Sequence, residues 1–270
     1  MSVARLILCA DDFALSRPIS ETIAELAHKG RLNAISCMTV CPGWAGDAGL
    51  LAGLGPHVQI GLHLTLTGEP PLTDMPEYLP DGGRMPDIDP LTATAMKGNL
   101  PLEEIAGEID AQFRAFRKAM GRAPDFVDAH QHAHVLPGIR GLFLDAVKHH
   151  APRAWIRDCG DRISAIAARP WRGKAIGSAY HARGLRRAAE RRGIACNTSF
   201  AGHYDFRSDY ERVFPTFLRR PGKMHLIMCH PGAGRLAGDG IADARPREAA
   251  VLHRMQIADM ARAYGLDFGA

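Results

Sequence analysis

The chain has 270 residues, of which 46% are hydrophobic, and its formal net charge is +4. This length can bury a large core, and a single α/β barrel of this size is ordinary. The positive charge comes from arginine-rich helical segments such as residues 183–192, which have no interleaved aromatic residues. Composition therefore does not indicate nucleic-acid binding. We expect one domain spanning residues 1–270.

Apolar residues and cysteines are distributed as in a cytoplasmic protein. No apolar run approaches the roughly 18 residues that a membrane span requires, and the run within residues 1–10 is too short for a signal sequence. The six cysteines form no Cys-x-x-Cys pair and lie mostly in apolar runs, as buried reduced thiols do. We expect a cytoplasmic location and no membrane span.

Short apolar runs alternate with helical patterns along most of the chain. The expected strands are residues 5–10, 34–41, 58–66, 126–129, 154–157, 194–198, 225–229 and 266–268. The expected helices are residues 20–28, 102–120, 138–149, 175–192, 208–219 and 247–264. About eight strands, each followed by a helix or long loop, predict an α/β fold with a distorted parallel (β/α) barrel similar to a TIM barrel. An open doubly wound sheet is the alternative.

The proline-rich segment 67–99 interrupts this alternation. Loops of this length in a compact domain are typically lids, binding loops or disordered segments. Because the segment leaves directly from the strand that contains His63, we expect it to cover a substrate.

Polar side chains follow several of the expected strands at the points where these strands end. They are Asp11, Asp12, His63, Asp128, His130, Arg157, Asp158 and His230. In a parallel barrel the carboxyl ends of the strands gather on one face, where active sites lie. We therefore expect these groups to share one site.

Adjacent carboxylates at Asp11 and Asp12 repel each other, and burial without a nearby positive charge costs several kcal/mol. A divalent cation would offset this cost, whereas capping of the following helix is the alternative. One carboxylate and two imidazoles from three strands form a set of ligands with open coordination positions, as in catalytic metal sites. Taken alone, a histidine in the position of His63 is more often a hydrogen-bonded core residue than a metal ligand.

The segment 125–137 places Asp128, His130, His132 and His134 at alternate positions. If the segment is a strand throughout, these four side chains share one face. A histidine-rich surface loop is the alternative. His230 has the chemistry of a proton donor, or is a turn residue before Pro231. Arg157 and Asp158 either hold a catalytic aspartate or form a structural ion pair.

Four motifs, in this order and spacing, resemble the YdjC-like carbohydrate deacetylase family, which includes chitooligosaccharide deacetylases. They are Cys9-Ala-Asp-Asp-Phe13, Gly61-Leu-His-Leu64, Val127-Asp-Ala-His-Gln-His-Ala-His134 and Met228-Cys-His-Pro231. With Pro71-Leu-Thr-Asp-Met-Pro76 and Leu102-Glu-Glu104, the resemblance spans nearly the whole chain. It implies a distorted (β/α) barrel, one divalent metal ion and removal of N-acetyl groups from amino sugars. Ala14 departs from the family, which usually has glycine there.

The resemblance also implies roles for particular residues. Asp12, His63 and His130 would bind the metal, magnesium or zinc, and Asp11 would be the catalytic base. We expect His230 to protonate the departing amine. On this account His130 is the one ligand from its segment, and Asp128, His132 and His134 orient ligands or line the pocket.

The resemblance predicts an N-acetylated oligosaccharide such as a chitooligosaccharide as substrate, and it is compatible with a homodimer. Two other functions fit the residues. A non-haem iron oxygenase uses a similar set of one carboxylate and two histidines. A non-catalytic sugar-binding protein would keep the pocket without the reaction.

Overall fold

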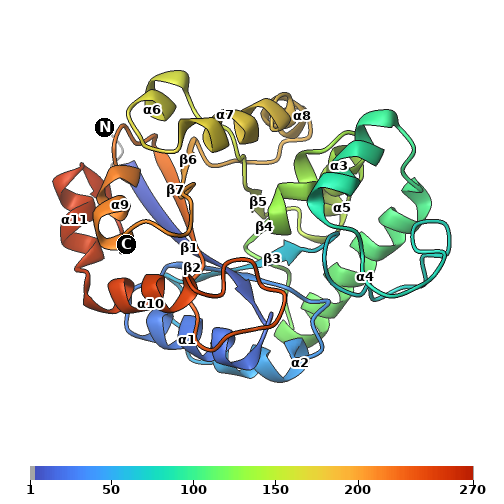
Figure 1. Ribbon diagram of the computed structural model, residues 1–270, viewed down its shortest axis with the longest axis horizontal. Helices are drawn as coiled ribbons and strands as arrows, with labels where there is room; N and C mark the ends of the chain where they lie inside the picture. The colour runs from blue at the N-terminus through green and yellow to red at the C-terminus, as the bar shows by residue number, and fades with distance from the viewer. Residues whose placement is uncertain (1–3, 270) are drawn as a thin grey trace.

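The computed structural model describes residues 4–269 and contains one curled parallel sheet surrounded by helices (Figure 1). The strands are β1 (Ala4–Phe13), β2 (Ala34–Cys37), β3 (Gln59–Leu64), β4 (Phe126–Ala129), β5 (Trp155–Ile156), β6 (Ser199–Ala201), β7 (Met224–Cys229) and β8 (Leu266–Asp267). Their order is β5-β4-β3-β2-β1-β7-β6, and β8 pairs with β1. An isolated bridge between Ile156 and Cys196 links the β5 edge to the chain just before β6. The predicted distorted parallel barrel is confirmed.

Strand β1 lies in the interior of this sheet, and its residues are apolar on both faces. Residues 6–10 are all fully buried, and the strand pairs with β2 on one side and β7 on the other. A continuous apolar run is typical of a parallel strand that is covered on both faces. The carboxylates of Asp11 and Asp12 therefore lie at the end of a deeply buried strand.

The helices are α1 (Arg17–His28), α2 (Trp44–Asp47), α3 (Ile88–Lys97), α4 (Leu102–Met120), α5 (Ile139–His150), α6 (Ile163–Ala167), α7 (Arg172–His181), α8 (Leu185–Glu190), α9 (Tyr210–Phe217), α10 (Arg245–Arg254) and α11 (Ile257–Ala263), with 3-10 turns η1 (Ala48–Leu51) and η2 (His130–Val135). Helix α4 has the predicted bounds, and Gly121 ends it at φ 68°, a left-handed conformation that glycine adopts without strain. None of the helices within residues 4–269 has both the length and the apolar character needed to cross a membrane.

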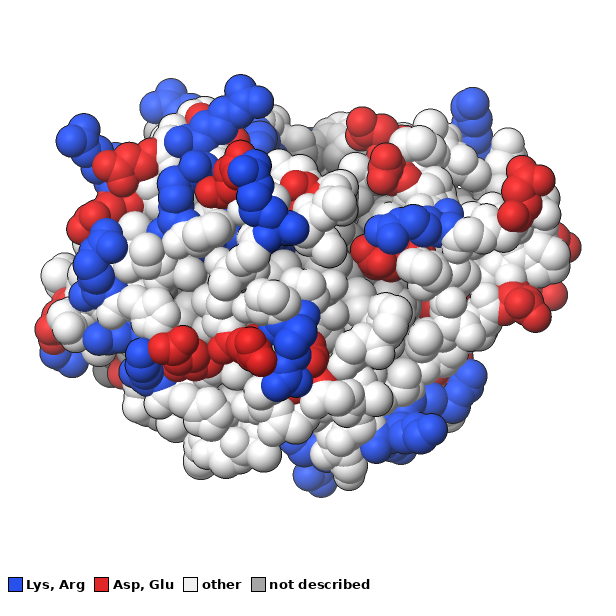
Figure 2. Space-filling view, turned by 60° about the horizontal axis from the view of Figure 1, so that its bottom comes forward, with Lys and Arg blue, Asp and Glu red and all other residues white. Residues whose placement is uncertain are grey.

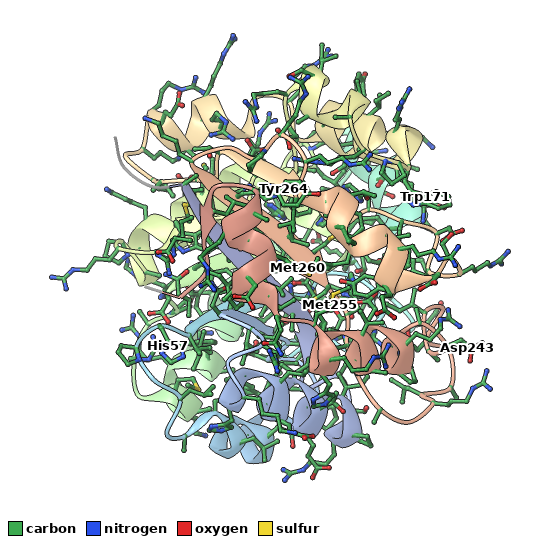
Figure 3. All side chains as sticks on the ribbon, turned by 90° about the vertical axis from the view of Figure 1, so that its left-hand side faces the viewer. His57, Trp171, Asp243, Met255, Met260 and Tyr264 are labelled. Carbon is green, nitrogen blue, oxygen red and sulfur yellow. The ribbon has the colours of Figure 1, made fainter. Side chains whose placement is uncertain are left out.

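Two long helices predicted from the sequence are each divided in the structure. Gly184, at φ 88°, separates α7 from α8. Met255 is extended and separates α10 from α11 (Figure 3), and its carbonyl oxygen accepts a hydrogen bond of 2.9 Å from Arg31. A contact across 224 residues thus sets this second break, and local periodicity could not reveal it.

The sixth strand is displaced from its predicted position at residues 194–198. Asn197 uses its side-chain amide to bond the backbone of Asp158, accepting from its nitrogen at 2.7 Å and donating to its oxygen at 2.9 Å. These bonds replace regular backbone pairing at this point, and the strand forms at Ser199–Ala201 instead.

The proline-rich segment packs onto α4 through buried or half-buried carboxylates. Glu108 accepts hydrogen bonds from the backbone nitrogens of Leu72 and Thr73, at 2.9 Å each. The segment also contains α3, whose Ile88 lines the cavity described below. The segment thus contributes to the cavity wall, and its expected role of covering a substrate stays a prediction. Elsewhere, basic and acidic side chains are interspersed on the face shown in Figure 2.

Candidate active site

A cavity of about 1040 Å³ lies at the carboxyl ends of the strands. Its lining includes the five residues expected to carry the chemistry: Asp11, Asp12, His63, His130 and His230. These residues come from β1, β3 and the ends of β4 and β7, as the barrel geometry predicts. Their roles remain predictions, but the structure brings them together.

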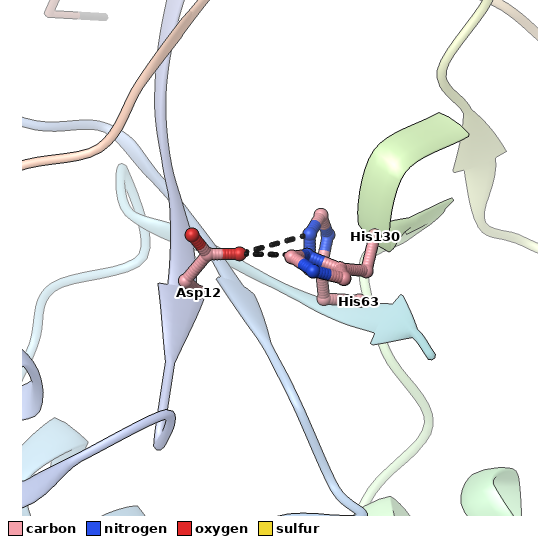
Figure 4. A group of neighbouring side chains, drawn as sticks. All are labelled: Asp12, His63 and His130. Carbon is pink, nitrogen blue, oxygen red and sulfur yellow. Dashed lines mark hydrogen bonds and ion pairs between the residues drawn. The ribbon is translucent and has the colours of Figure 1, made fainter. Parts of the chain in front are cut away.

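Asp12, His63 and His130 converge on one point (Figure 4). Asp12 Oδ1 lies 3.4 Å from His63 Nε2 and 3.0 Å from His130 Nδ1. One ligand atom from each residue lies within 4.8 Å of the others. Asp12 and His63 are buried, whereas His130 is partly exposed to the cavity. A carboxylate and two imidazoles so arranged fit a divalent cation that keeps an open position toward the cavity.

Asp12 is held from its other side by Arg245, whose Nη2 lies 2.8 Å from Asp12 Oδ2. Burial raises the pKa of Asp12, but the charges of Arg245 and His130 outweigh this effect and hold the pKa well below its usual range. Asp12 is therefore a carboxylate with one oxygen directed at the two imidazoles.

The adjacent aspartates point in different directions because β1 is irregular at its end. The pairing of β1 with β2 shifts register between Ala10 and Phe13, and Asp12 has a φ of 65°. Such a bulge redirects consecutive side chains. Asp12 reaches the histidines, while Asp11 turns toward Arg157.

His63 is oriented by a buried partner on its other nitrogen. Its Nδ1 lies 2.7 Å from Asp128 Oδ1, which also accepts a hydrogen bond from Ser36. Burial lowers the pKa of His63, but the negative charges of Asp128 and Asp11 outweigh it and raise the pKa to about 10. The carboxylates around His63 thus favour a positive charge at or beside its ring. A bound metal cation would supply that charge.

Asp11 accepts two hydrogen bonds from Arg157, at 2.6 Å each. Arg157 is completely buried and also contacts Asp128. From the sequence, Arg157 either held a catalytic aspartate or formed a structural ion pair. In the structure it does both, because its ion-pair partner is Asp11, the candidate base. His230 Nε2 lies 3.9 Å from Asp11 Oδ2, so the candidate base and acid are neighbours.

Sequence reasoning missed the residues that support His230. Glu248, fully buried on α10, accepts a hydrogen bond of 2.6 Å from the backbone nitrogen of His230. The Tyr204 hydroxyl donates a hydrogen bond to the same carboxylate. Phe206 packs edge-on against the His230 ring, with centroids 5.4 Å apart. Glu248 lies on the apolar face of its helix, and a charged residue in such a position indicates a buried partner. This was the sequence signal that could have identified it.

The histidine-rich segment is a strand only as far as Ala129. Residues His130–Val135 form the turn η2, in which Gln131 and His132 have φ values of 51° and 60°. The expectation of four side chains on one strand face is therefore wrong. His130 reaches Asp12, and His132 lines the cavity, whereas His134 is buried with its Nε2 2.8 Å from the Arg157 carbonyl oxygen.

The fold and the converging side chains define an α/β-barrel protein with a candidate metal centre at the carboxyl ends of its strands. The chain belongs to the family described as YdjC-like protein, which it matches over residues 5–263. This confirms the family resemblance.

Among its relatives, chitooligosaccharide deacetylases of Yersinia enterocolitica and Proteus mirabilis are 37% and 35% identical over 51% and 54% of this chain. These matches cover 53% and 56% of the two relatives, so the chain spans about half the length of the curated relatives it matches. The chitooligosaccharide deacetylase of Klebsiella pneumoniae is 29% identical over 84% of this chain and 81% of its own.

Two solved structures share the fold. One, described as a cellobiose-phosphate cleavage protein of Enterococcus faecalis V583, has a TM-score of 0.75 and 20% identity, covering 99% of this chain and 97% of its own. The other, a peptidoglycan N-acetylglucosamine deacetylase, has a TM-score of 0.50 and 10% identity, covering 98% and 85%.

Proposed function

We propose that this protein is a metal-dependent hydrolase that removes N-acetyl groups from amino-sugar carbohydrates such as chitooligosaccharides. The observation that carries the proposal is the convergence of Asp12, His63 and His130 beside the neighbouring pair Asp11 and His230. The names of the relatives support a carbohydrate deacetylase, and the cavity of about 1040 Å³ has room for more than one sugar ring.

Asp12, His63 and His130 would hold a divalent cation, magnesium or zinc. When bound, such a cation supplies Lewis-acid chemistry, because it lowers the pKa of a water molecule to about 7 and polarises a carbonyl group. Ser36 and Asp128 keep the His63 ring turned so that its Nε2 faces Asp12.

Asp11 is the group that takes the proton of the attacking water. Although Arg157 occupies one position on each of its oxygens, a carboxylate has about four lone-pair sites, so an acceptor site remains. The guanidinium also fixes the direction of the carboxylate. His230 then gives a proton to the amine nitrogen as the amide bond breaks, and its position 3.9 Å from Asp11 places acid and base on the same side of the cavity.

The test is metal analysis of the purified protein together with acetate release from a panel of N-acetylated oligosaccharides. We expect about one divalent ion per chain and one acetate for each free amine formed. Iron-dependent turnover that consumes 2-oxoglutarate would favour an oxygenase instead. Sugar binding without acetate release, in metal-loaded protein, would favour a non-catalytic binding protein. The molecular mass in solution tests the homodimer, which remains a proposal.

A further inference from the structure

Two histidines without a role in the proposed reaction face the same cavity. His132 follows β4 within η2, and His203 follows β6. Their ring centroids lie 5.9 Å apart, with the rings nearly perpendicular at 89°. Both residues line the cavity, as does His230. The loops after two separate strands thus bring two imidazoles side by side in one wall.

Each of these rings has a buried nitrogen with no hydrogen-bond partner among residues 4–269. These atoms are His132 Nδ1 and His203 Nε2. Leaving a buried polar atom without a partner costs about 1–3 kcal/mol. Buried polar atoms in folded proteins are normally hydrogen-bonded, so each exception needs an explanation. Since both rings also line the cavity, the explanation we favour is that these imidazoles adjust to hydrogen-bond a polar ligand bound there.

The two rings are held in place by Phe200 on β6. The Phe200 ring packs edge-on against His132 at 5.5 Å and against His203 at 5.2 Å between centroids. The Arg157 guanidinium lies 5.8 Å from the Phe200 centroid, so Phe200 is itself held by the residue that binds Asp11. The histidine pair is therefore fixed relative to the candidate base.

The backbone that presents His132 is strained. Gln131 and His132 both lie in the left-handed region, which costs about 1–2 kcal/mol for a residue with a side chain. Strain of this kind persists where the surrounding structure enforces it, and it concentrates at binding sites. Here the buried bond between His134 and the Arg157 carbonyl anchors the end of the turn.

The chemistry of His203 favours an uncharged ligand. Burial and the positive charges of Lys174 and Arg157 lower the pKa of His203 to about 4, so this ring is neutral near pH 7. A neutral imidazole has one donor and one acceptor, which match a hydroxyl or an amide better than an anion. Among the described residues, neither histidine belongs to a group of three potential metal ligands.

We propose that His132 and His203 form a hydrogen-bonding subsite that positions a hydroxyl-bearing, uncharged sugar ring of the substrate beside the candidate metal centre. This inference rests on the proposed function and makes it more specific. It makes the two histidines positioning residues that bind the substrate without taking part in the proton transfers.

The test measures binding of N,N'-diacetylchitobiose by calorimetry to metal-loaded Asp11→Asn protein, in which the candidate base is absent and the sugar is not consumed. His203→Phe and His132→Phe keep an aromatic ring against Phe200 but remove the polar nitrogens. We expect each to weaken binding about three- to tenfold, the effect of one lost hydrogen bond. His203→Gln retains a donor and an acceptor and should restore most of the affinity.

His149→Phe is the matched control, because His149 is exposed on α5, away from the cavity lining. Metal content and thermal stability are measured for every variant, and neither should change enough to account for the loss of affinity. If the Phe variants bind the sugar within twofold of the Asp11→Asn parent, the subsite is refuted while the proposed function stands. If the wild-type protein releases no acetate from any N-acetylated sugar, the proposed reaction fails, and the subsite fails with it only if the sugar also does not bind.

Discussion

Arg157 donates hydrogen bonds to both carboxylate oxygens of Asp11, at 2.6 Å each, and contacts Asp128 with the same guanidinium. All three side chains are buried. Removing Arg157 would leave both carboxylates buried without their positive partner, and breaking a buried ion pair in this way typically costs 3–5 kcal/mol. Since Asp128 in turn orients His63, Arg157 links the candidate base to the candidate metal ligands.

Replacing Asp11 by asparagine should separate catalysis from metal binding. Asparagine has nearly the same shape but is not a base, so we expect kcat to fall at least about 100-fold, as the loss of a general base predicts. Metal content should stay the same, because Asp12, His63 and His130 are unchanged. Acetate release and elemental analysis check the two parts.

The exposed Asp74→Asn variant is the control for loss of one carboxylate. Because Arg157 keeps Asp128 as a partner in the Asp11→Asn protein, folding should survive, and a thermal melt verifies this. Activity within tenfold of the wild type would show that another group is the base.

His63→Ala should release the metal. The substitution removes one of three candidate ligands and leaves the carboxylate of Asp128 without its imidazole partner. We expect at least a 10-fold loss of metal affinity and a loss of acetate release. Dialysis against a chelator followed by metal titration measures the first effect, with His149→Ala as the surface control. A His63→Ala protein that holds metal as tightly as the wild type would contradict the assigned ligand set.

Ala14→Gly should stabilise the protein. Ala14 is buried and has a φ of 78°, a conformation that costs about 1–2 kcal/mol for alanine and little for glycine. Glycine also increases the entropy of the unfolded chain, which offsets part of the gain. We expect a net gain of about 1 kcal/mol and a rise in Tm of roughly 2–4 °C.

The matched control for Ala14→Gly is Ala106→Gly, inside α4 and beyond its first turn, where glycine should cost about 1 kcal/mol. A thermal melt of both proteins gives the two shifts. Equal destabilisation by both substitutions would mean that the backbone at Ala14 is not strained in solution.

Much of this fold could be predicted because its signals are local. The apolar run of β1 and the periodicity of α4, ended by Gly121, gave elements that the structure contains. Parallel topology then placed Asp12, His63 and His130 on one face, because strand ends in a barrel gather there. Parallel topology accounts for these side chains sharing one face, whereas the choice of Asp12 over Asp11 as a ligand came from the family resemblance and depends on the irregular end of β1.

Other parts of the site depend on contacts between distant segments and have no local signal. Arg245 reaches Asp12 across 233 residues, and Ser36 reaches Asp128 across 92. The position of Glu248 on the apolar face of its helix is a local signal, but its partner, the backbone nitrogen of His230, lies on another segment. The displaced sixth strand has the same origin, since the side chain of Asn197 takes the backbone bonds that pairing would use.

His225 gives a pH prediction away from the candidate metal centre. Its ring is buried on β7, with Nδ1 2.7 Å from Ser199 Oγ and Nε2 2.9 Å from the Phe217 carbonyl oxygen. Burial and the positive charge of Arg169 lower the pKa of His225 to about 3, against about 6.5 in an unfolded chain. The folded state therefore disfavours the protonated ring.

The contribution of His225 to stability is fully present above about pH 6.5 and decreases as the pH falls from there toward about 3. Within that window one such histidine adds a slope of about 1.4 kcal/mol per pH unit to the free energy of unfolding. In His225→Gln the amide can still bond the Phe217 carbonyl but does not titrate, so this slope should fall by about that amount. Urea unfolding at intervals between pH 8 and pH 5 measures the slopes, with the exposed His149→Gln as the control. Equal slopes in His225→Gln and wild-type protein would show that His225 is not held neutral by the fold.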